Sequence, residues 1–280
     1  MTKLVVKPPF AYYGGKTTLA DRIAATLPAH RHYVEPFAGS LAVLLAKPPS
    51  VMETVNDLDQ AIVNFWRVLR NRPDDLARVC ALTPHSRAEF EDSQDVDAGD
   101  ELEQARRLWV RLAQGRSGRL RRAGWRHYVS PGAVSTAFPS YLDGYVDRMA
   151  AAVERLHHVT LECRPALEII ERYGACEDVL LYVDPPYLGT TRANDRSYRH
   201  ELMADDEHRV LAEVLRACTA AVVLSGYASD LYDQELFPDW HRTTFQSGTG
   251  QGPGGSGWSN RVEVLWSNRA PQHDLFGGVA

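Results

Sequence analysis

The residues best suited to chemistry in this chain are four consecutive ones: Asp184, Pro185, Pro186 and Tyr187. They follow residues 179–183, an apolar run whose length and β-branched content predict a buried strand. Two successive prolines must end that strand, because neither has a backbone N–H and each fixes φ. Ligand sites in open α/β sheets gather beyond the carboxyl ends of strands. The pattern therefore places a carboxylate, a rigid backbone and an aromatic ring where a planar, amino-bearing ring could be held.

Two other predicted strands also end in residues suited to ligand binding. The strand predicted at 32–37 runs into a turn at Gly39, where a ligand can approach the backbone closely. The strand predicted at 51–56 is followed by Asp57, at a position that accepts hydrogen bonds from ribose hydroxyls in nucleoside-binding sheets. Asp57 fits equally well as the N-cap of a helix that starts at Leu58. A single glycine in the first turn argues against the GxGxxG fingerprint of dinucleotide-dependent oxidoreductases.

The N-terminal segment raises an alternative from another class of protein. Gly15, Lys16 and Thr17 resemble the end of a Walker A loop, and residues 180–184 resemble a Walker B strand, as in a P-loop nucleotide hydrolase. The Walker A pattern needs a glycine five positions before Gly15, where this chain has Phe10. A turn that merely opens a helix at Thr17 is the simpler structural interpretation.

Strand-like and helix-like segments alternate along the chain, which is typical of an α/β sheet. Strands are predicted at 32–37, 51–56, 159–163, 179–184, 220–225, 241–246 and 262–267, and helices after Gly39 and at 58–70, 141–157 and 205–218. A βαβ unit needs about 30 residues, yet the second and third strands lie far further apart. We therefore predict a Rossmann-like, mostly parallel seven-stranded sheet with helices on both faces. We expect a catalytic domain at 1–70 and 141–280 and an inserted module at 71–140.

Charge is unevenly distributed in this chain of 280 residues, whose net charge is −5. Residues 89–103 contain eight acids and no Lys or Arg, whereas 106–127 contain eight arginines and no acid. Arginines interleaved with Trp125 and Tyr128 favour nucleic-acid contact, although the acidic block could instead neutralise them. The glycine-rich segment 248–257 predicts a mobile loop.

Composition excludes several classes of protein. No apolar stretch approaches the roughly 20 residues of a membrane helix, and the N-terminus lacks the features of a secretory signal. We therefore expect a cytoplasmic protein without a membrane partner. The four cysteines have no metal-ligand spacing, so reduced thiols and no structural zinc are expected.

Taken together, the motifs resemble those of the DNA adenine N6-methyltransferases of the Dam type. The resemblance covers nearly the whole chain and is carried by Tyr-Tyr-Gly-Gly-Lys at 12–16, Val-Glu-Pro-Phe-Ala-Gly at 34–39, Asn-Asp at 56–57, Asp-Pro-Pro-Tyr at 184–187, Leu-Ser-Gly-Tyr at 224–227 and the closing strand at 261–268. It departs at Leu41, where the family usually has a glycine, and at Pro165, where an acidic or polar residue near the cofactor adenine is common.

The resemblance implies methyl transfer from S-adenosylmethionine to adenine N6 in double-stranded DNA at a specific short sequence, after base flipping and without a metal. The catalytic residues it implies are Asp184, Pro185 and Tyr187. The cofactor-binding residues it implies are Tyr12, Lys16, Glu35, Phe37, Gly39, Asp57 and Asp184. Those expected on DNA are Arg116, Arg119, Arg121, Arg122 and Arg126, with further contacts from Arg106, Arg107 and Arg111.

The resemblance also fits a bacterial or phage-encoded enzyme, for which a cognate restriction endonuclease is a candidate partner. Three alternatives stay open at this point: methyl transfer to another amino acceptor such as cytosine N4 or an amide, P-loop nucleotide hydrolysis, and a DNA-binding protein without catalysis. The sequence gives no indication of the oligomeric state.

Overall fold

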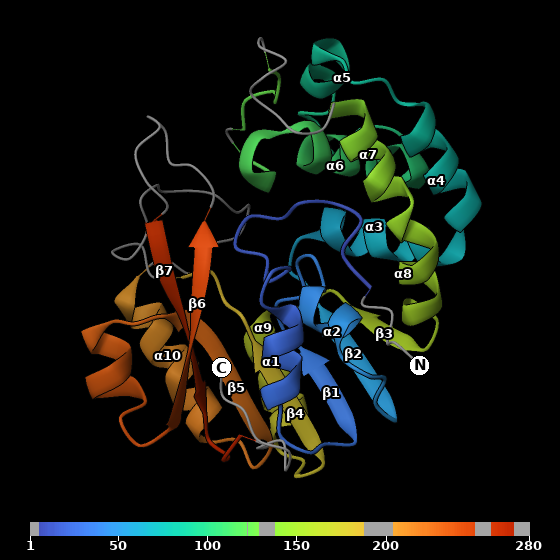
Figure 1. Ribbon diagram of the computed structural model, residues 1–280. Helices are drawn as coiled ribbons and strands as arrows, with labels where there is room; N and C mark the ends of the chain where they lie inside the picture. Colours follow the sequence, from blue (N-terminus) through green and yellow to red (C-terminus); the bar gives the residue numbers. More distant parts are fainter. Residues whose placement is uncertain (1–5, 122, 129–137, 188–203, 250–258, 272–280) are drawn as a thin grey trace.

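The computed structural model describes residues 6–121, 123–128, 138–187, 204–249 and 259–271. Seven strands form one sheet in the order β3-β2-β1-β4-β5-β7-β6 (Figure 1). Their bounds are β1 His32–Glu35, β2 Met52–Asn56, β3 Val159–Glu162, β4 Val179–Val183, β5 Ala221–Tyr227, β6 His241–Thr249 and β7 Ser259–Ser267. Only β7 runs antiparallel to its neighbours. The predicted mostly parallel seven-stranded α/β sheet is confirmed.

The helices occupy most of the remaining described chain. Their bounds are α1 Ala20–Thr26, α2 Ala42–Ala46, α3 Gln60–Asn71, α4 Pro73–Leu82, α5 Arg87–Asp92, α6 Glu101–Gln114, α7 Phe138–Val146, α8 Arg148–Leu156, α9 Ala166–Gly174 and α10 Asp205–Arg216, with short turns η1 Arg116–Gly118 and η4 Leu231–Leu236. The helix predicted at 141–157 is in fact two helices, α7 and α8. The predicted loop at 248–257 begins later than expected, because β6 continues to Thr249. Its residues 250–258 lie outside the described residues.

Helices cover both faces of the sheet, as the sequence predicts. Strand residues alternate between two hydrophobic clusters, because successive side chains point to opposite faces. Tyr33 and Leu180 are in register and pack with α1, α2 and α3. Val34 and Leu181, the next pair along, pack with α9 and α10.

The long connection between β2 and β3 forms a group of helices beyond the carboxyl edge of the sheet, coloured teal to green in Figure 1. These helices are not a separate globule, since α6 packs on α3 and both contribute to the first hydrophobic cluster. The fully buried Trp109 of α6 also donates a hydrogen bond from Nε1 to the Pro9 carbonyl at 2.9 Å. A shared core thus fixes the insert relative to the sheet edge.

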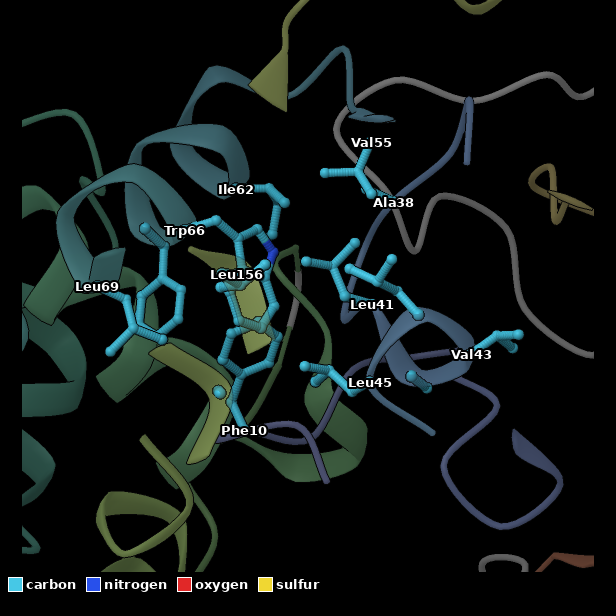
Figure 2. Packing of buried hydrophobic residues seen from close by; sticks show 14 of the residues in the cluster. Phe10, Ala38, Leu41, Val43, Leu45, Val55, Ile62, Trp66, Leu69 and Leu156 are labelled. Atoms are coloured by element: carbon cyan, nitrogen blue, oxygen red, sulfur yellow. The ribbon is translucent and has the colours of Figure 1, made fainter. Parts of the chain in front are cut away.

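The turn after β1 requires left-handed backbone at two positions, Gly39 (φ +46°) and Leu41 (φ +55°). A side chain at Gly39 would place its Cβ 2.8 Å from Cε1 of Tyr12. Leu41, the departure from the family's glycine, is fully buried, and Figure 2 shows it pointing from α2 toward Trp66 of α3. Burying a leucine side chain contributes about 1.5–3 kcal/mol, which offsets the roughly 1–2 kcal/mol cost of left-handed backbone.

The described part of the chain contains no helix that is both long and apolar enough to cross a membrane. Nor do its residues include a group of three His, Cys, Asp or Glu side chains placed to hold a metal ion. The four cysteines are all free thiols.

Candidate active site

The candidate site is a cavity of about 270 Å³ at the carboxyl ends of β1 and β4. These strands are neighbours, yet the chain continues from β1 to β2 on one side and from β4 to β5 on the other. Such a switch point leaves a crevice where open α/β sheets bind ligands. All the residues predicted to bind the cofactor line this cavity: Tyr12, Lys16, Glu35, Phe37, Gly39, Asp57 and Asp184.

Asp57 ties two turns together at the cavity wall. Its Oδ2 accepts a hydrogen bond from the Gly39 N–H and its Oδ1 one from the Asp59 N–H, both at 2.9 Å. The alternative role of Asp57 as a helix N-cap is wrong, because α3 begins at Gln60 and the Asp59 side chain caps it. Burial raises the pKa of Asp57 to about 6, against the opposing effect of these backbone hydrogen bonds. A carboxylate has lone pairs for further donors, so Asp57 can also accept hydrogen bonds from a ligand.

Glu35 lies deeper, at the end of β1. Its Oε1 accepts hydrogen bonds from the Tyr33 hydroxyl at 2.6 Å and from the Leu44 N–H at 2.9 Å. Burial raises its pKa to about 8 despite these two donors. A buried carboxyl group of this kind is ready to ionise when a cation binds nearby.

Asp184 is at the carboxyl end of β4, where the sequence predicts it. Its side chain is 19% exposed, and both oxygens accept hydrogen bonds from Lys16 Nζ at 2.7 Å. Burial raises the pKa of Asp184 even though Lys16 opposes the shift. For Lys16, burial acts to lower the pKa, but the carboxylates of Asp184 and Glu263 outweigh it and raise the pKa. Lys16, which was expected against the cofactor, lines the cavity, and its ammonium binds the predicted catalytic acid.

Two polar residues that the sequence reasoning did not single out complete this cluster. Glu263 of β7 has Oε1 3.6 Å from Lys16 Nζ and accepts a hydrogen bond from the Ser225 hydroxyl at 2.7 Å. It also accepts a hydrogen bond from the Tyr187 hydroxyl. Both residues lie in segments that carry the family resemblance, and each is a buried polar residue in a strand of apolar neighbours. A polar residue between apolar strand neighbours was the feature of the sequence that could have identified both residues.

Tyr187 is half-buried and packs edge-on against Tyr227, with ring centroids 4.6 Å apart. Lys16 Nζ lies 4.9 Å from the centroid of the Tyr187 ring. Burial and the charges of Asp184 and Glu263 raise the pKa of Tyr187 well above its usual value, so the phenol stays protonated and can donate to Glu263. Pro185 is buried and Pro186 lines the cavity.

The arginine block divides into two parts. The α6 arginines, which were expected to add DNA contacts, have partners within the protein: Arg106 pairs with Glu103 and Glu89, and Arg107 pairs with Glu103. Arg111 is 3% exposed, and its Nε donates to the Leu120 carbonyl. These three side chains therefore stabilise the insert through the acidic block and core contacts.

The arginines after α6 are arranged differently. Arg116 and Arg121 are exposed, whereas Arg119 lies over the Tyr13 ring, 4.4 Å from its centroid. Arg126 lies over the Phe138 and Tyr141 rings, at 5.4 and 4.9 Å. Among the described residues, none of these four guanidinium groups pairs with a carboxylate within 4.0 Å. Arg122 lies outside the described residues.

A backbone contact also joins residues 116–126, the arginine segment, to the cavity. Tyr13 lines the cavity, and its N–H donates to the Gly118 carbonyl at 2.9 Å. Gly118 has φ +59°, and a Cβ there would lie 2.7 Å from the Ala11 backbone. The close approach of the two segments therefore depends on glycine.

Pro165, the second departure from the family, lines the cavity with Ala166 and Leu167. These residues form the start of α9. The first N–H groups of a helix have no partner within the helix, so the backbone here can donate to a ligand where a polar side chain is common in the family.

An acid and a glycine turn lie at the switch point of a Rossmann-like sheet in which an antiparallel β7 lies between β5 and β6, the arrangement expected of a methyltransferase. Residues 12–246 match the D12 class N6 adenine-specific DNA methyltransferases, and this chain belongs to that family. The DNA adenine methylase of Vibrio cholerae serotype O1 is 27% identical over 208 residues, covering 72% of this chain and 73% of that protein.

Solved structures resemble the chain only loosely. The precorrin 8w decarboxylase of Methanobacterium thermoautotrophicum aligns with 94% of this chain and 95% of its own, at 10% identity and a TM-score of 0.40. A SAM-dependent methyltransferase from Agrobacterium tumefaciens aligns with 90% of this chain and 60% of its own, at 12% identity and a TM-score of 0.37. The family assignment does not depend on either.

The P-loop alternative is not supported. Lys16 Nζ binds Asp184, and α1 begins only at Ala20, with Leu19 as its N-cap. A P-loop lysine instead reaches into the phosphate site at the start of the helix that follows it. The turn at 14–16 therefore does not open a helix at Thr17 either.

Proposed function

We propose that this protein transfers the methyl group of S-adenosylmethionine to the exocyclic N6 of adenine in double-stranded DNA, at a specific short sequence and after base flipping. The observation that carries the proposal is that one cavity reaches from Asp57 and Gly39, a nucleoside-type cradle, to Asp184. Donor and acceptor would therefore meet at the end of β4.

The residues of the cavity fit the methyl donor. Asp57 would accept from the ribose hydroxyls. Because Gly39 has no Cβ, the Tyr12 ring can pack closely on the turn, and the methionine end would lie beside that turn. Glu35, with its raised pKa, would ionise beside the cationic end of the ligand. When bound, S-adenosylmethionine supplies an electrophilic methyl group on a sulfonium. Holding both partners in line can contribute about 7–11 kcal/mol at best.

Asp184 would act on the acceptor. The lone pair of adenine N6 is delocalised into the ring, which makes the amine a weak nucleophile. An N6 hydrogen donated to the Asp184 carboxylate, and the other to the Pro185 carbonyl, would localise that lone pair toward the methyl group. A charge-assisted hydrogen bond of this kind is worth about 1.5–3 kcal/mol.

Such chemistry cannot reach a base that is stacked in a duplex, so the adenine must be turned out. Tyr187, whose hydroxyl is fixed by Glu263, would offer its ring to the base. Arg116 and Arg121 would contact phosphates, while Arg119 and Arg126 would present guanidinium groups aligned by aromatic rings. The helical insert that carries these arginines would serve as the target-recognition module.

The test is methyl transfer to unmodified genomic DNA with isotopically labelled donor, followed by digestion to nucleosides and mass spectrometry. We expect label in N6-methyl-2′-deoxyadenosine, more from duplex than from single-stranded DNA, and within one short sequence on sequencing. Label in N4-methylcytosine, or in protein rather than DNA, would show instead that the site holds a different amino acceptor.

A further inference from the structure

The Lys16 ammonium binds the carboxylate that the proposed function assigns to the adenine amine. It donates to both oxygens of Asp184 at 2.7 Å and to the Gly14 carbonyl at 2.9 Å. It also lies 4.9 Å from the centroid of the Tyr187 ring. An amine on a ring that binds Asp184 and stacks on Tyr187 would therefore compete with Lys16 for the Asp184 oxygens.

Water is a poor destination for the displaced ammonium. The Lys16 and Glu263 side chains are 5% and 6% exposed, and Asp184 is 19% exposed. A buried cation that loses its partner is costly. The group already placed to receive it is Glu263, whose Oε1 lies 3.6 Å from Lys16 Nζ. A small movement of the lysine would replace one carboxylate by the other.

Two hydroxyl groups hold Glu263 in place. Because they are neutral, the carboxylate keeps its negative charge for Lys16. Ser225 donates to Glu263 Oε1 at 2.7 Å, and Tyr187 donates to the same atom. Among the described residues, no hydrogen bond reaches the second carboxylate oxygen, which can accept another donor. Glu263 also connects the lysine to Tyr187, since it contacts both side chains.

We propose that Glu263 is a positioning residue that takes over Lys16 from Asp184 when the target amine binds. This inference rests on the proposed function and deepens it. In the free enzyme Lys16 keeps Asp184 paired and closed to other donors. When the neutral amine arrives, Lys16 moves to Glu263, so the buried cluster keeps one cation between two carboxylates throughout. Without Glu263 the amine would have to leave Lys16 unpaired.

The experiment compares Glu263→Gln, Lys16→Met and the double variant with the wild-type enzyme. Gln keeps an oxygen that accepts from Ser225 and Tyr187 but removes the charge that attracts Lys16. We expect Glu263→Gln to lower kcat for DNA by about tenfold or more, with DNA and donor Kd within about threefold of wild type. The double variant should have a higher kcat than Glu263→Gln, because no ammonium then blocks Asp184.

Glu53→Gln is the matched control. Glu53 is also a buried carboxylate paired with a lysine, Lys47 at 2.6 Å, but it does not line the cavity. Melting temperatures and donor titrations identify variants that fail to fold. If Glu263→Gln fails to fold, Ser225→Ala replaces it in the test. We expect Ser225→Ala to lower kcat severalfold. An unchanged kcat would contradict the inference.

The outcomes separate this inference from the proposed function. If the wild-type enzyme does not methylate adenine, the proposed function fails. If it does, but Glu263→Gln has wild-type kcat, or the double variant is as slow as Glu263→Gln or slower, the exchange of Lys16 is wrong while the function stands. Recovery of kcat in the double variant is the result that a purely structural role for Glu263 would not produce.

Discussion

Two charged regions of the molecule differ in how their charges are neutralised. They are the cavity edge, formed by Lys16, Asp184 and Glu263, and the arginine segment of the insert, residues 116–126. At the cavity edge, Lys16 lies between Asp184 and Glu263, all three largely shielded from water. In the arginine segment, Arg116 and Arg121 are exposed, and Arg119 rests on an aromatic ring. The first region satisfies its charges internally, whereas the second leaves them for an external partner.

This difference indicates what each region can recognise. Buried charges that are already paired interact strongly with a ligand only by exchanging partners, which favours a small group of defined geometry. Exposed guanidinium groups attract a polyanion at longer range, and that attraction weakens with salt. The two regions thus suit one amine and a phosphate backbone, respectively.

The largest effect should come from removing the acid of the cavity edge. Asp184→Ala should lower kcat by about 10²–10⁴-fold, because N6 then loses its charged acceptor. Binding of S-adenosylmethionine, followed by calorimetry, should stay within about threefold of wild type, since Asp57 and the Gly39 turn are untouched. Turnover near the wild-type rate would contradict the assigned role and remove the contrast between the regions.

The second region should respond in affinity rather than in chemistry. Arg116→Ala with Arg121→Ala should weaken duplex binding by about tenfold or more at low salt, and lower the slope of log K against log salt by about 0.9 for each phosphate that is no longer neutralised. Fluorescence anisotropy over a salt series measures both quantities. At saturating DNA, kcat should change little.

The matched control removes two arginines elsewhere. Arg209 and Arg216 on α10 are paired with Glu235 and Asp239. Replacing both by alanine changes the net charge equally, so an equal loss of salt dependence would show that the arginine segment is not a special contact surface.

Much of the fold was predictable from the sequence. Strands such as β4 are continuous apolar runs, and the Asp-Pro-Pro-Tyr motif marks where β4 must end. The uneven strand spacing located the insert. Boundaries were less accurate where cap chemistry decides them: the Asp59 side chain, not Asp57, begins α3.

The sequence predicted which residues lie at the end of each strand, but not which of these residues bind one another. Sequence motifs placed Asp184 and Lys16 at one edge, yet nothing in their spacing shows that they bind each other across 168 positions. Likewise, the eight arginines at 106–127 looked equivalent in the sequence. Only packing separates those on α6, which are paired with acids or buried, from those beyond it. Charge partners depend on tertiary geometry.

The contact between Gly118 and the segment at 11–13 joins the arginine segment to the cavity, and it can be tested by itself. Gly118→Ala should destabilise the protein by about 1–3 kcal/mol, because φ is left-handed there and the new Cβ would meet the Ala11 backbone at 2.7 Å. It should also weaken donor binding, since Tyr13 lines the cavity. Denaturant unfolding and calorimetry provide the measurements.

Gly124→Ala is the control in the same segment, because its nearest neighbour would be the Arg116 Cδ at 4.0 Å. If both variants behave alike, the contact between Gly118 and Ala11 does not join the regions.

The smallest effect concerns pH and tests whether the cavity binds its ligand through Asp57. Its pKa, raised to about 6 by burial, means that the carboxyl is ionised above pH 6 and gains a proton below it. Ribose hydroxyls donate more strongly to the ionised form, so affinity for S-adenosylmethionine should fall severalfold, up to about tenfold, as pH drops from 7 to 5. In Asp57→Asn the affinity should be lower at pH 7 and nearly independent of pH over this range. The same slope in both proteins would assign the titration to another group and leave Asp57 only its two backbone hydrogen bonds, which hold the Gly39 turn against the start of α3.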